Sequence, residues 1–129
     1  MKEQTHHWIG HAEYDPNTAE AMFKTGRHLY VSFMGQQTIE KILKGFIVEW
    51  KDTYSPYSHN LRRLAEISGI DAEMSDEQLK FLDDLTPFCV MTRYPAYKDK
   101  MAALSTPDPS EEYLSRTKEM FQWLRQKIS

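Results

Sequence analysis

The sequence predicts an all-α fold, an up-and-down bundle of four long helices with additional short helices. In several segments, apolar residues recur three and four positions apart, as they do on one face of a helix. No window sustains the two-residue alternation of a half-buried strand. The length of 129 residues is that of one domain, so we expect residues 1–129 to form a single helical domain.

The central helix of this bundle is predicted over residues 30–50, a stretch without proline. Its apolar face consists of Ile39, Ile42, Leu43, Phe46, Ile47 and Trp50. Gly35 and Gly45 each lower helix propensity by about 1 kcal/mol relative to alanine. Two such residues within one helix indicate that another helix or chain approaches closely there.

A first helical pattern begins at Trp8 and meets a proline. Asp15 is a good N-cap and Pro16 suits a first helical position, so we expect the helix to restart there. The alternative is one long helix kinked at Pro16. Gly26 is expected to stop this segment before the central helix begins.

The next helix follows a turn-rich linker over residues 51–60. Ser58, His59 and Asn60 are all plausible first residues. Gly69 is expected to end this helix, because glycine readily takes the left-handed conformation found after helix ends.

Two more helices carry start signals. Ser75 and Gln78 form a capping box, and Pro87 is expected to kink or break the helix that follows them. Asp108 and Pro109 predict the start of the last helix. Its core-facing side consists of Tyr113, Thr117, Met120, Phe121, Leu124 and Ile128.

Composition excludes several classes of protein. The formal net charge of −3 argues against a wholesale basic nucleic-acid binder, although a local basic patch remains possible. Cys89 is the single cysteine, which excludes an intrachain disulfide and fits a reducing compartment. No apolar run approaches the roughly 18 residues of a membrane span, and the polar amino terminus does not resemble a signal peptide. We therefore expect a cytoplasmic protein without membrane association.

The most site-like segment contains Arg93, Tyr94, Tyr97 and Lys98. An arginine can form a bidentate contact with a phosphate, and tyrosine rings can stack on a base. The alternative is that Arg93 pairs with a local carboxylate while the tyrosine rings pack on the bundle. Either interpretation is compatible with the residues alone.

A polar stripe follows the central helix beside its apolar face. It comprises Gln37, Glu40, Lys41 and Lys44, and Glu40 precedes Lys44 by four residues, the favourable order for an ion pair. This stripe either lines a pocket or partner surface, or is a solvated helix face, which is the default for polar residues at this spacing.

The histidines leave alternatives open. His59 is either a general base or a helix cap. His7 and His11 lie four residues apart, a spacing that can bind a metal on a helix, but no third ligand stands at a telling distance. We therefore predict neither a metal site nor a cofactor.

Beyond these features, the chain resembles the HEPN (higher eukaryotes and prokaryotes nucleotide-binding) family. Residues 36–45, QQTIEKILKG, are similar to its QQ-x-x-EK-x-LK signature. Residues 58–61, SHNL, and residues 92–95, TRYP, are similar to two further motifs in the same order. The resemblance implies a helical bundle that pairs into a homodimer, with a minimal nucleotidyltransferase as partner.

Cleaving members of that family carry an arginine, four to six residues, and then a histidine that acts without metal. After Arg93, the matching positions hold Lys98, Asp99 and Lys100. An ordinary lysine remains protonated at pH 7 and is a poor general base. The resemblance therefore implies a non-cleaving subunit that binds nucleotide or RNA through Arg93.

Two other functions stay open at this point. The first is a metal-independent RNase toxin of a HEPN–nucleotidyltransferase pair, with Lys98 or His59 as the substitute for the missing histidine. The second is a dimeric scaffold in which the Arg93 segment is purely structural. Whether the protein is an enzyme is not decided by the sequence.

Overall fold

The computed structural model describes residues 1–90 and 107–128. Within these residues it contains five α-helices, two short 3-10 helices and no strand, which confirms the predicted all-α fold. The elements are α1 (Glu3–Lys24), α2 (His28–Lys51), α3 (Leu61–Ser68), η1 (Ile70–Glu73), α4 (Asp76–Leu85), η2 (Thr86–Val90) and α6 (Pro107–Ile128).

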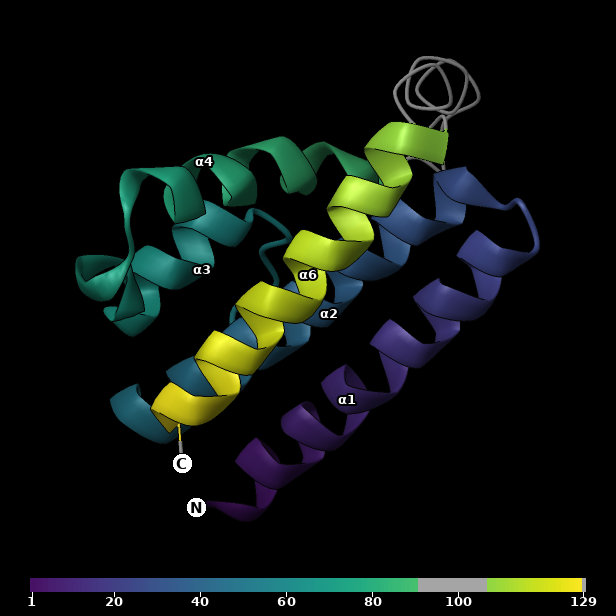
Figure 1. Ribbon diagram of the computed structural model, residues 1–129. Helices are drawn as coiled ribbons and strands as arrows, with labels where there is room; N and C mark the ends of the chain where they lie inside the picture. The colour runs from purple at the N-terminus through teal and green to yellow at the C-terminus, as the bar shows by residue number, and fades with distance from the viewer. Residues whose placement is uncertain (91–106, 129) are drawn as a thin grey trace.

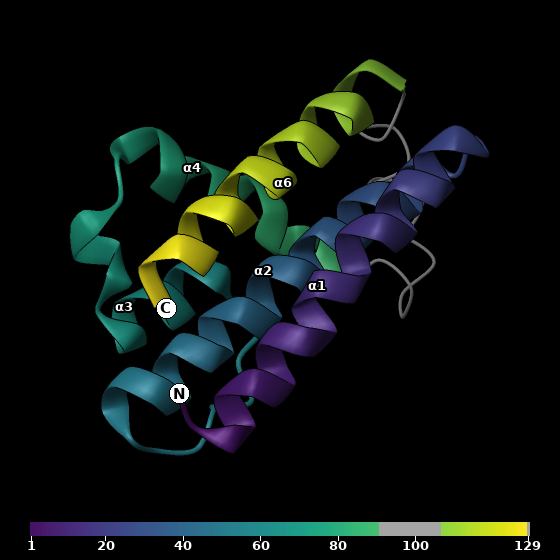
Figure 2. The same cartoon turned by 60° about the horizontal axis from the view of Figure 1, so that its bottom comes forward.

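The arrangement is organised around α2. Helices α1 and α2 form an antiparallel pair, and α6 lies along both in the direction of α2 (Figure 1). Helices α3 and α4 pack on the other side of α2 from α1 (Figure 2). Helix α2 is thus covered from several sides at once.

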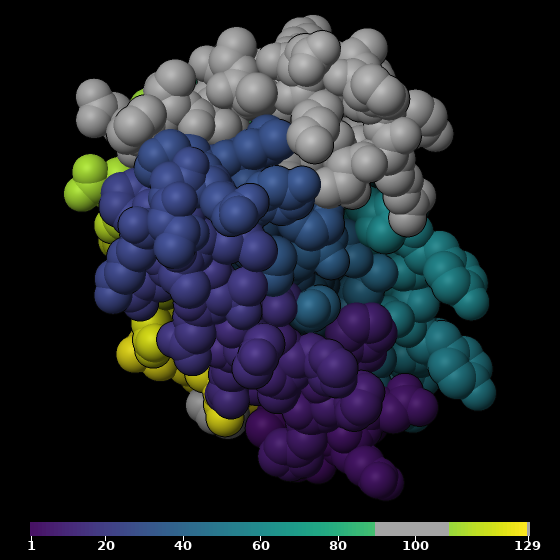
Figure 3. Space-filling model, turned by 90° about the vertical axis from the view of Figure 1, so that its right-hand side faces the viewer, coloured from purple at the N-terminus to yellow at the C-terminus, as the bar shows by residue number. Residues whose placement is uncertain are grey.

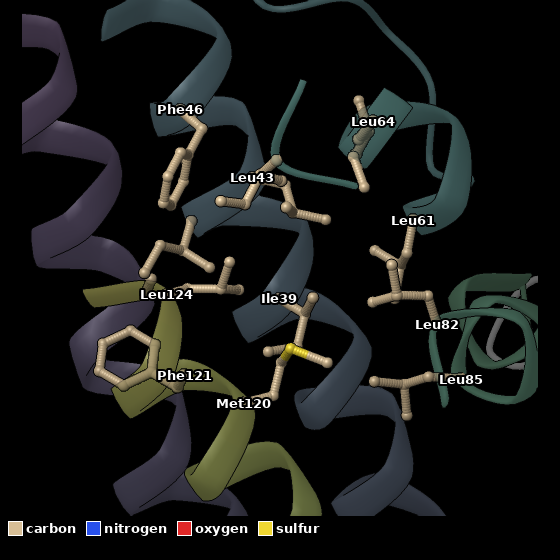
Figure 4. Close-up of a cluster of buried hydrophobic side chains, with 14 of the residues drawn as sticks. Ile39, Leu43, Phe46, Leu61, Leu64, Leu82, Leu85, Met120, Phe121 and Leu124 are labelled. Carbon is tan, nitrogen blue, oxygen red and sulfur yellow. The ribbon is translucent and has the colours of Figure 1, made fainter. Parts of the chain in front are cut away.

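The apolar core forms where these helices meet α2 (Figure 4). The predicted apolar face of α2 is buried except at its end, where Trp50 is exposed. Trp50 lies in the last turn of α2, and its ring contacts Phe46 edge-on while the remaining ring surface faces solvent. The side chains labelled in Figure 4 are Ile39, Leu43, Phe46, Leu61, Leu64, Leu82, Leu85, Met120, Phe121 and Leu124.

The two glycines of α2 mark close helix contacts, as predicted. A Cβ at Gly35 would lie 2.7 Å from Oγ1 of Thr117 on α6. A Cβ at Gly45 would lie 3.5 Å from Cβ of Trp8 on α1, an ordinary van der Waals distance. Only the contact with α6 therefore requires glycine for steric reasons.

The prediction that a helix restarts at Asp15 and Pro16 is wrong. Helix α1 runs unbroken through Pro16, although an interior proline costs about 3 kcal/mol or more. Burial of Ile9, Ala12 and Ala19 on one side of α1 offsets that cost. Asp15 is consequently not a cap but a buried residue within the helix.

Other helix ends follow the sequence signals. The capping box of Ser75 and Gln78 is present, and Gly69 ends α3 with φ +90°. Helix α4 ends at Leu85, before Pro87, and the chain continues as the 3-10 helix η2. The last helix begins at Pro107, slightly before the predicted start.

The close approach at Gly35 yields a stability prediction. Alanine at this position gains about 1 kcal/mol of helix propensity but forces its Cβ onto the Thr117 hydroxyl, and such overpacking costs about 1–3 kcal/mol. We expect Gly35→Ala to lower the free energy of unfolding in urea by about 1 kcal/mol. In a Thr117→Ala background the same substitution should be neutral or stabilising.

Gly45→Ala is the matched control, because its Cβ meets only ordinary contacts. Oγ1 of Thr117 has no hydrogen-bond partner among the described residues, so Thr117→Ala removes no hydrogen bond. Equal effects of Gly35→Ala in both backgrounds would contradict the steric explanation.

Candidate functional site

A buried carboxylate on α2 has three side-chain partners. Oε1 of Glu40 accepts a hydrogen bond from Nε2 of Gln36 at 3.0 Å and lies 2.8 Å from Nδ1 of His59. Oε2 of Glu40 accepts from Nζ of Lys44 at 3.1 Å. We refer to Gln36, Glu40, Lys44 and His59 as the Glu40 cluster. It joins two of the sequence motifs, one on α2 and one in the loop before α3.

The Glu40 cluster stabilises the charged form of its carboxylate. Burial by itself raises the pKa of Glu40, but the hydrogen bonds from Gln36 and His59 and the charge of Lys44 together outweigh burial. The pKa of Glu40 therefore lies below its ordinary value, and the carboxylate is ionised at neutral pH. Its counter-charge, the Lys44 ammonium, is also buried.

His59 is held in a specific orientation by this carboxylate. Its backbone oxygen also accepts from Nε2 of Gln36 at 3.1 Å, while 45% of its side chain is exposed. A proton on Nδ1 would be donated to Glu40, leaving Nε2 as an acceptor. A histidine oriented by a carboxylate has the arrangement of a general base.

Of the two alternatives for His59, the helix cap is wrong. Asn60 is the cap, since its side chain accepts a hydrogen bond from the backbone N–H of Arg63 at 3.1 Å. The cap position belongs to the residue with extended backbone directly before the first helical turn, and that residue is Asn60. The imidazole of His59 is thereby left to contact Glu40.

The other two polar residues of the stripe, Lys41 and Gln37, have partners as well. Nζ of Lys41 lies 2.6 Å from Oδ2 of the buried Asp15, which ties α2 to α1. Nε2 of Gln37 donates to Oε1 of Gln36 at 2.8 Å. The interpretation of the stripe as a solvated face is wrong for Glu40 and Lys44, because neighbouring elements cover this side of α2 too.

Four predicted site residues, Arg93, Tyr94, Tyr97 and Lys98, lie outside the described residues. The site that can be described consists of the Glu40 cluster with the adjoining Lys41, Asp15 and Gln37.

Comparison with known proteins gives the chain a family. The model of the HEPN domain matches residues 5–127, nearly the whole sequence. The chain belongs to the HEPN family. The predicted resemblance is thus confirmed, and the Glu40 cluster of this HEPN protein contains residues of two of the motifs that carried it.

A solved structure supports the same fold. The crystal structure of TT1696 from Thermus thermophilus superimposes with a TM-score of 0.81 over 98% of this chain and 100% of that one. Sequence identity is 20%, so the likeness shows the fold alone. A comparison with curated proteins finds no match.

Two residues in or beside the candidate site, Gln36 and Trp8, were not predicted as site residues by the sequence analysis. Gln36 lies four positions before Glu40, the same helical spacing that indicated the Glu40–Lys44 pair, and could have been found by it. Trp8 lies close to Lys44, with Nζ 5.6 Å from the ring centroid. No local signal indicates that contact, since it joins two different helices.

The described part of the chain offers no metal-binding group of three or more His, Cys, Asp or Glu side chains. The rings of His7 and His11 contact each other, with centroids 4.6 Å apart. Within the same part of the chain, no helix is long and apolar enough to span a membrane.

The Glu40 cluster predicts a specific response to acid. A carboxylate whose folded pKa is lowered stabilises the fold above its unfolded pKa, and this stabilisation is lost as the pH falls through the folded pKa. At pH 7, Glu40→Gln should reduce the free energy of unfolding by about 3 kcal/mol, because Lys44 loses its counter-charge. The difference between the two proteins should begin to narrow as the pH falls below about 4.3, the ordinary pKa of a glutamate, and should continue to shrink toward the lower folded pKa.

Urea denaturation at several pH values measures this difference. Glu73→Gln is the control, because Glu73 pairs with Lys127 at the surface and such pairs contribute little. A stability difference between wild type and Glu40→Gln that is constant from pH 7 to 3 would refute the role assigned to the carboxylate.

Proposed function

We propose that this HEPN protein is a non-cleaving subunit that binds nucleotide or RNA and pairs with a minimal nucleotidyltransferase. The observation that carries the proposal is the family motif around Arg93 without a histidine at the catalytic spacing. Arg93 retains the ability to contact a phosphate. The residues at positions 98–100 are lysine, aspartate and lysine, none of which ordinarily exchanges a proton near pH 7.

The ion pairs of α2 support the assignment of phosphate binding to the Arg93 segment rather than to α2. Lys41 is paired with Asp15, and Lys44 is paired with Glu40. Neither lysine therefore offers an uncompensated positive charge to a phosphate. In this proposal the phosphate contact falls to Arg93 and Lys98, with Tyr94 and Tyr97 as stacking rings.

The partner and the homodimer are proposed on the basis of family membership. HEPN proteins of this motif pattern are expected to pair with a minimal nucleotidyltransferase. Co-expression with a nucleotidyltransferase encoded beside this protein, followed by purification of the complex, tests that part of the proposal directly.

Binding should depend on Arg93. With a short fluorescein-labelled single-stranded RNA, fluorescence anisotropy should show saturable binding that Arg93→Ala weakens about tenfold or more, as expected for loss of a charged hydrogen bond. Arg125→Ala is the matched control, because Arg125 pairs with Glu13 on the surface of the bundle. Absence of affinity for RNA, nucleotides and the nucleotidyltransferase would overturn the proposal.

A second candidate function is favoured by the contact between His59 and Glu40. With its Nδ1 held at 2.8 Å from the carboxylate, His59 presents Nε2 as a base for a ribose 2′-OH. The 2′ oxygen would attack the adjacent phosphorus as its proton moves to Nε2, and the bond to the 5′ oxygen would break as that oxygen takes a proton from water, giving a cyclic phosphate. This is the metal-independent RNase function with His59 as the substitute histidine.

Incubation with RNA in the presence of EDTA separates the two candidates. Under the main proposal the RNA stays intact with wild-type protein. Cleavage by wild type that is lost in both His59→Ala and Arg93→Ala would establish the RNase and overturn the non-cleaving assignment. Asn60→Ser is a useful control, since it keeps a cap for α3 beside an unchanged His59.

A further inference from the structure

A groove lies where α1 begins and α2 ends. Its volume is ≈ 650 Å³, within the range of pockets that hold small organic molecules. The first turns of α1 and the chain that follows α2 form its walls, and Figure 3 shows these two segments, purple and teal, side by side on one face. The side chains used below are Trp8, His7, Lys44, Tyr54 and Tyr57.

The walls of the groove are rich in aromatic rings. Tyr54 and Tyr57 flank Pro56 in the loop after α2, and they are 85% and 100% exposed. Trp8 and His7 face the groove from α1. Two exposed rings that line the same groove favour an interaction surface there, and flat rings stack well on other flat rings.

The groove also contains a hydrogen-bond donor with spare capacity. An ammonium group has three protons. Nζ of Lys44 donates one to Glu40, and the Trp8 ring lies 5.6 Å away. No other acceptor for Nζ is found among the described residues. The side chain of Lys44 is only 9% exposed, so a remaining proton is best satisfied by an acceptor that enters the groove.

Charge narrows the class of ligand. The groove walls contain no carboxylate, whereas the grooves beside α6 are lined by Glu77, Glu112 and Glu119. The positive charge of Lys44 disfavours an organic cation, and its pairing with Glu40 means that it does not strongly select an anion. A flat, neutral heterocycle with a carbonyl group can stack on the rings and accept a hydrogen bond from Lys44.

We propose that this groove binds a nucleobase, either of a free nucleotide or of an unpaired residue in RNA. The base stacks on Tyr54 or Tyr57 with Trp8 nearby, and a ring carbonyl accepts a hydrogen bond from Lys44. The inference deepens the proposed function and rests on it for the ligand class. It uses no residue of the segment 91–106, so the groove and Arg93 can be tested separately.

The test compares wild type with the Tyr54→Ala/Tyr57→Ala double variant by isothermal titration with UMP and GMP. Because both rings are exposed, the double variant should remain as stable as wild type. Loss of stacking should weaken binding about tenfold or more. Tyr14→Ala is the matched control: Tyr14 is 73% exposed on α1 and lies outside the groove walls.

Ribose 5-phosphate serves as a probe without a base and should bind at least about tenfold more weakly than UMP, since stacking is lost. The same variants are then titrated with the labelled RNA. A tyrosine-dependent effect on UMP and GMP identifies a free nucleotide as the ligand, and an effect on RNA alone identifies an unpaired base in a strand.

Three results overturn the inference. The first is wild-type affinity of the double variant for UMP, GMP and RNA alike. The second is equal binding of ribose 5-phosphate and UMP. The third is a wild-type protein that binds neither nucleotides nor RNA, in which case the proposed function fails as well. If binding depends on Arg93 but not on Tyr54 and Tyr57, the inference that the groove binds a nucleobase is rejected, while the proposed function stands.

Discussion

The structure depends on the burial of α2 on nearly all sides. Helices α1, α3, α4 and α6 all contact it, so most polar side chains along its length must find partners inside the protein. A buried carboxylate without partners would be very unfavourable. Glu40 meets this requirement through Gln36, Lys44 and His59, and these contacts fix the position of the loop before α3 relative to α2.

The burial of α2 also connects the Glu40 cluster to the groove lined by Trp8, Tyr54 and Tyr57. Lys44 belongs to both, because its ammonium binds Glu40 on one side and faces the groove on the other. The loop that carries Tyr54 and Tyr57 starts at the end of α2 and is fixed at His59 by the same carboxylate. A single buried charge thereby orients a histidine and anchors one end of the loop that carries the two rings.

The HEPN signature on α2 can be understood in the same terms. Its glutamate and second lysine form a buried pair, and its first lysine bonds to Asp15 of α1. These residues hold three parts of the chain together, whatever ligand the protein binds. Their presence therefore supports the fold directly and does not by itself indicate an activity.

The sequence determined the helices, most of their ends and the family, because these follow from short-range features. A capping box such as Ser75 with Gln78 forms between neighbours in the chain, and an apolar stripe needs only the helical repeat. It did not determine that Glu40 is buried or that His59 contacts it. Its signals at Asp15 and Pro16 favoured a helix restart, whereas the helix continues through both residues. Those outcomes depend on how many helices surround α2 and on which loop returns to it. No local pattern encodes that information, because the contacts join residues far apart in the chain.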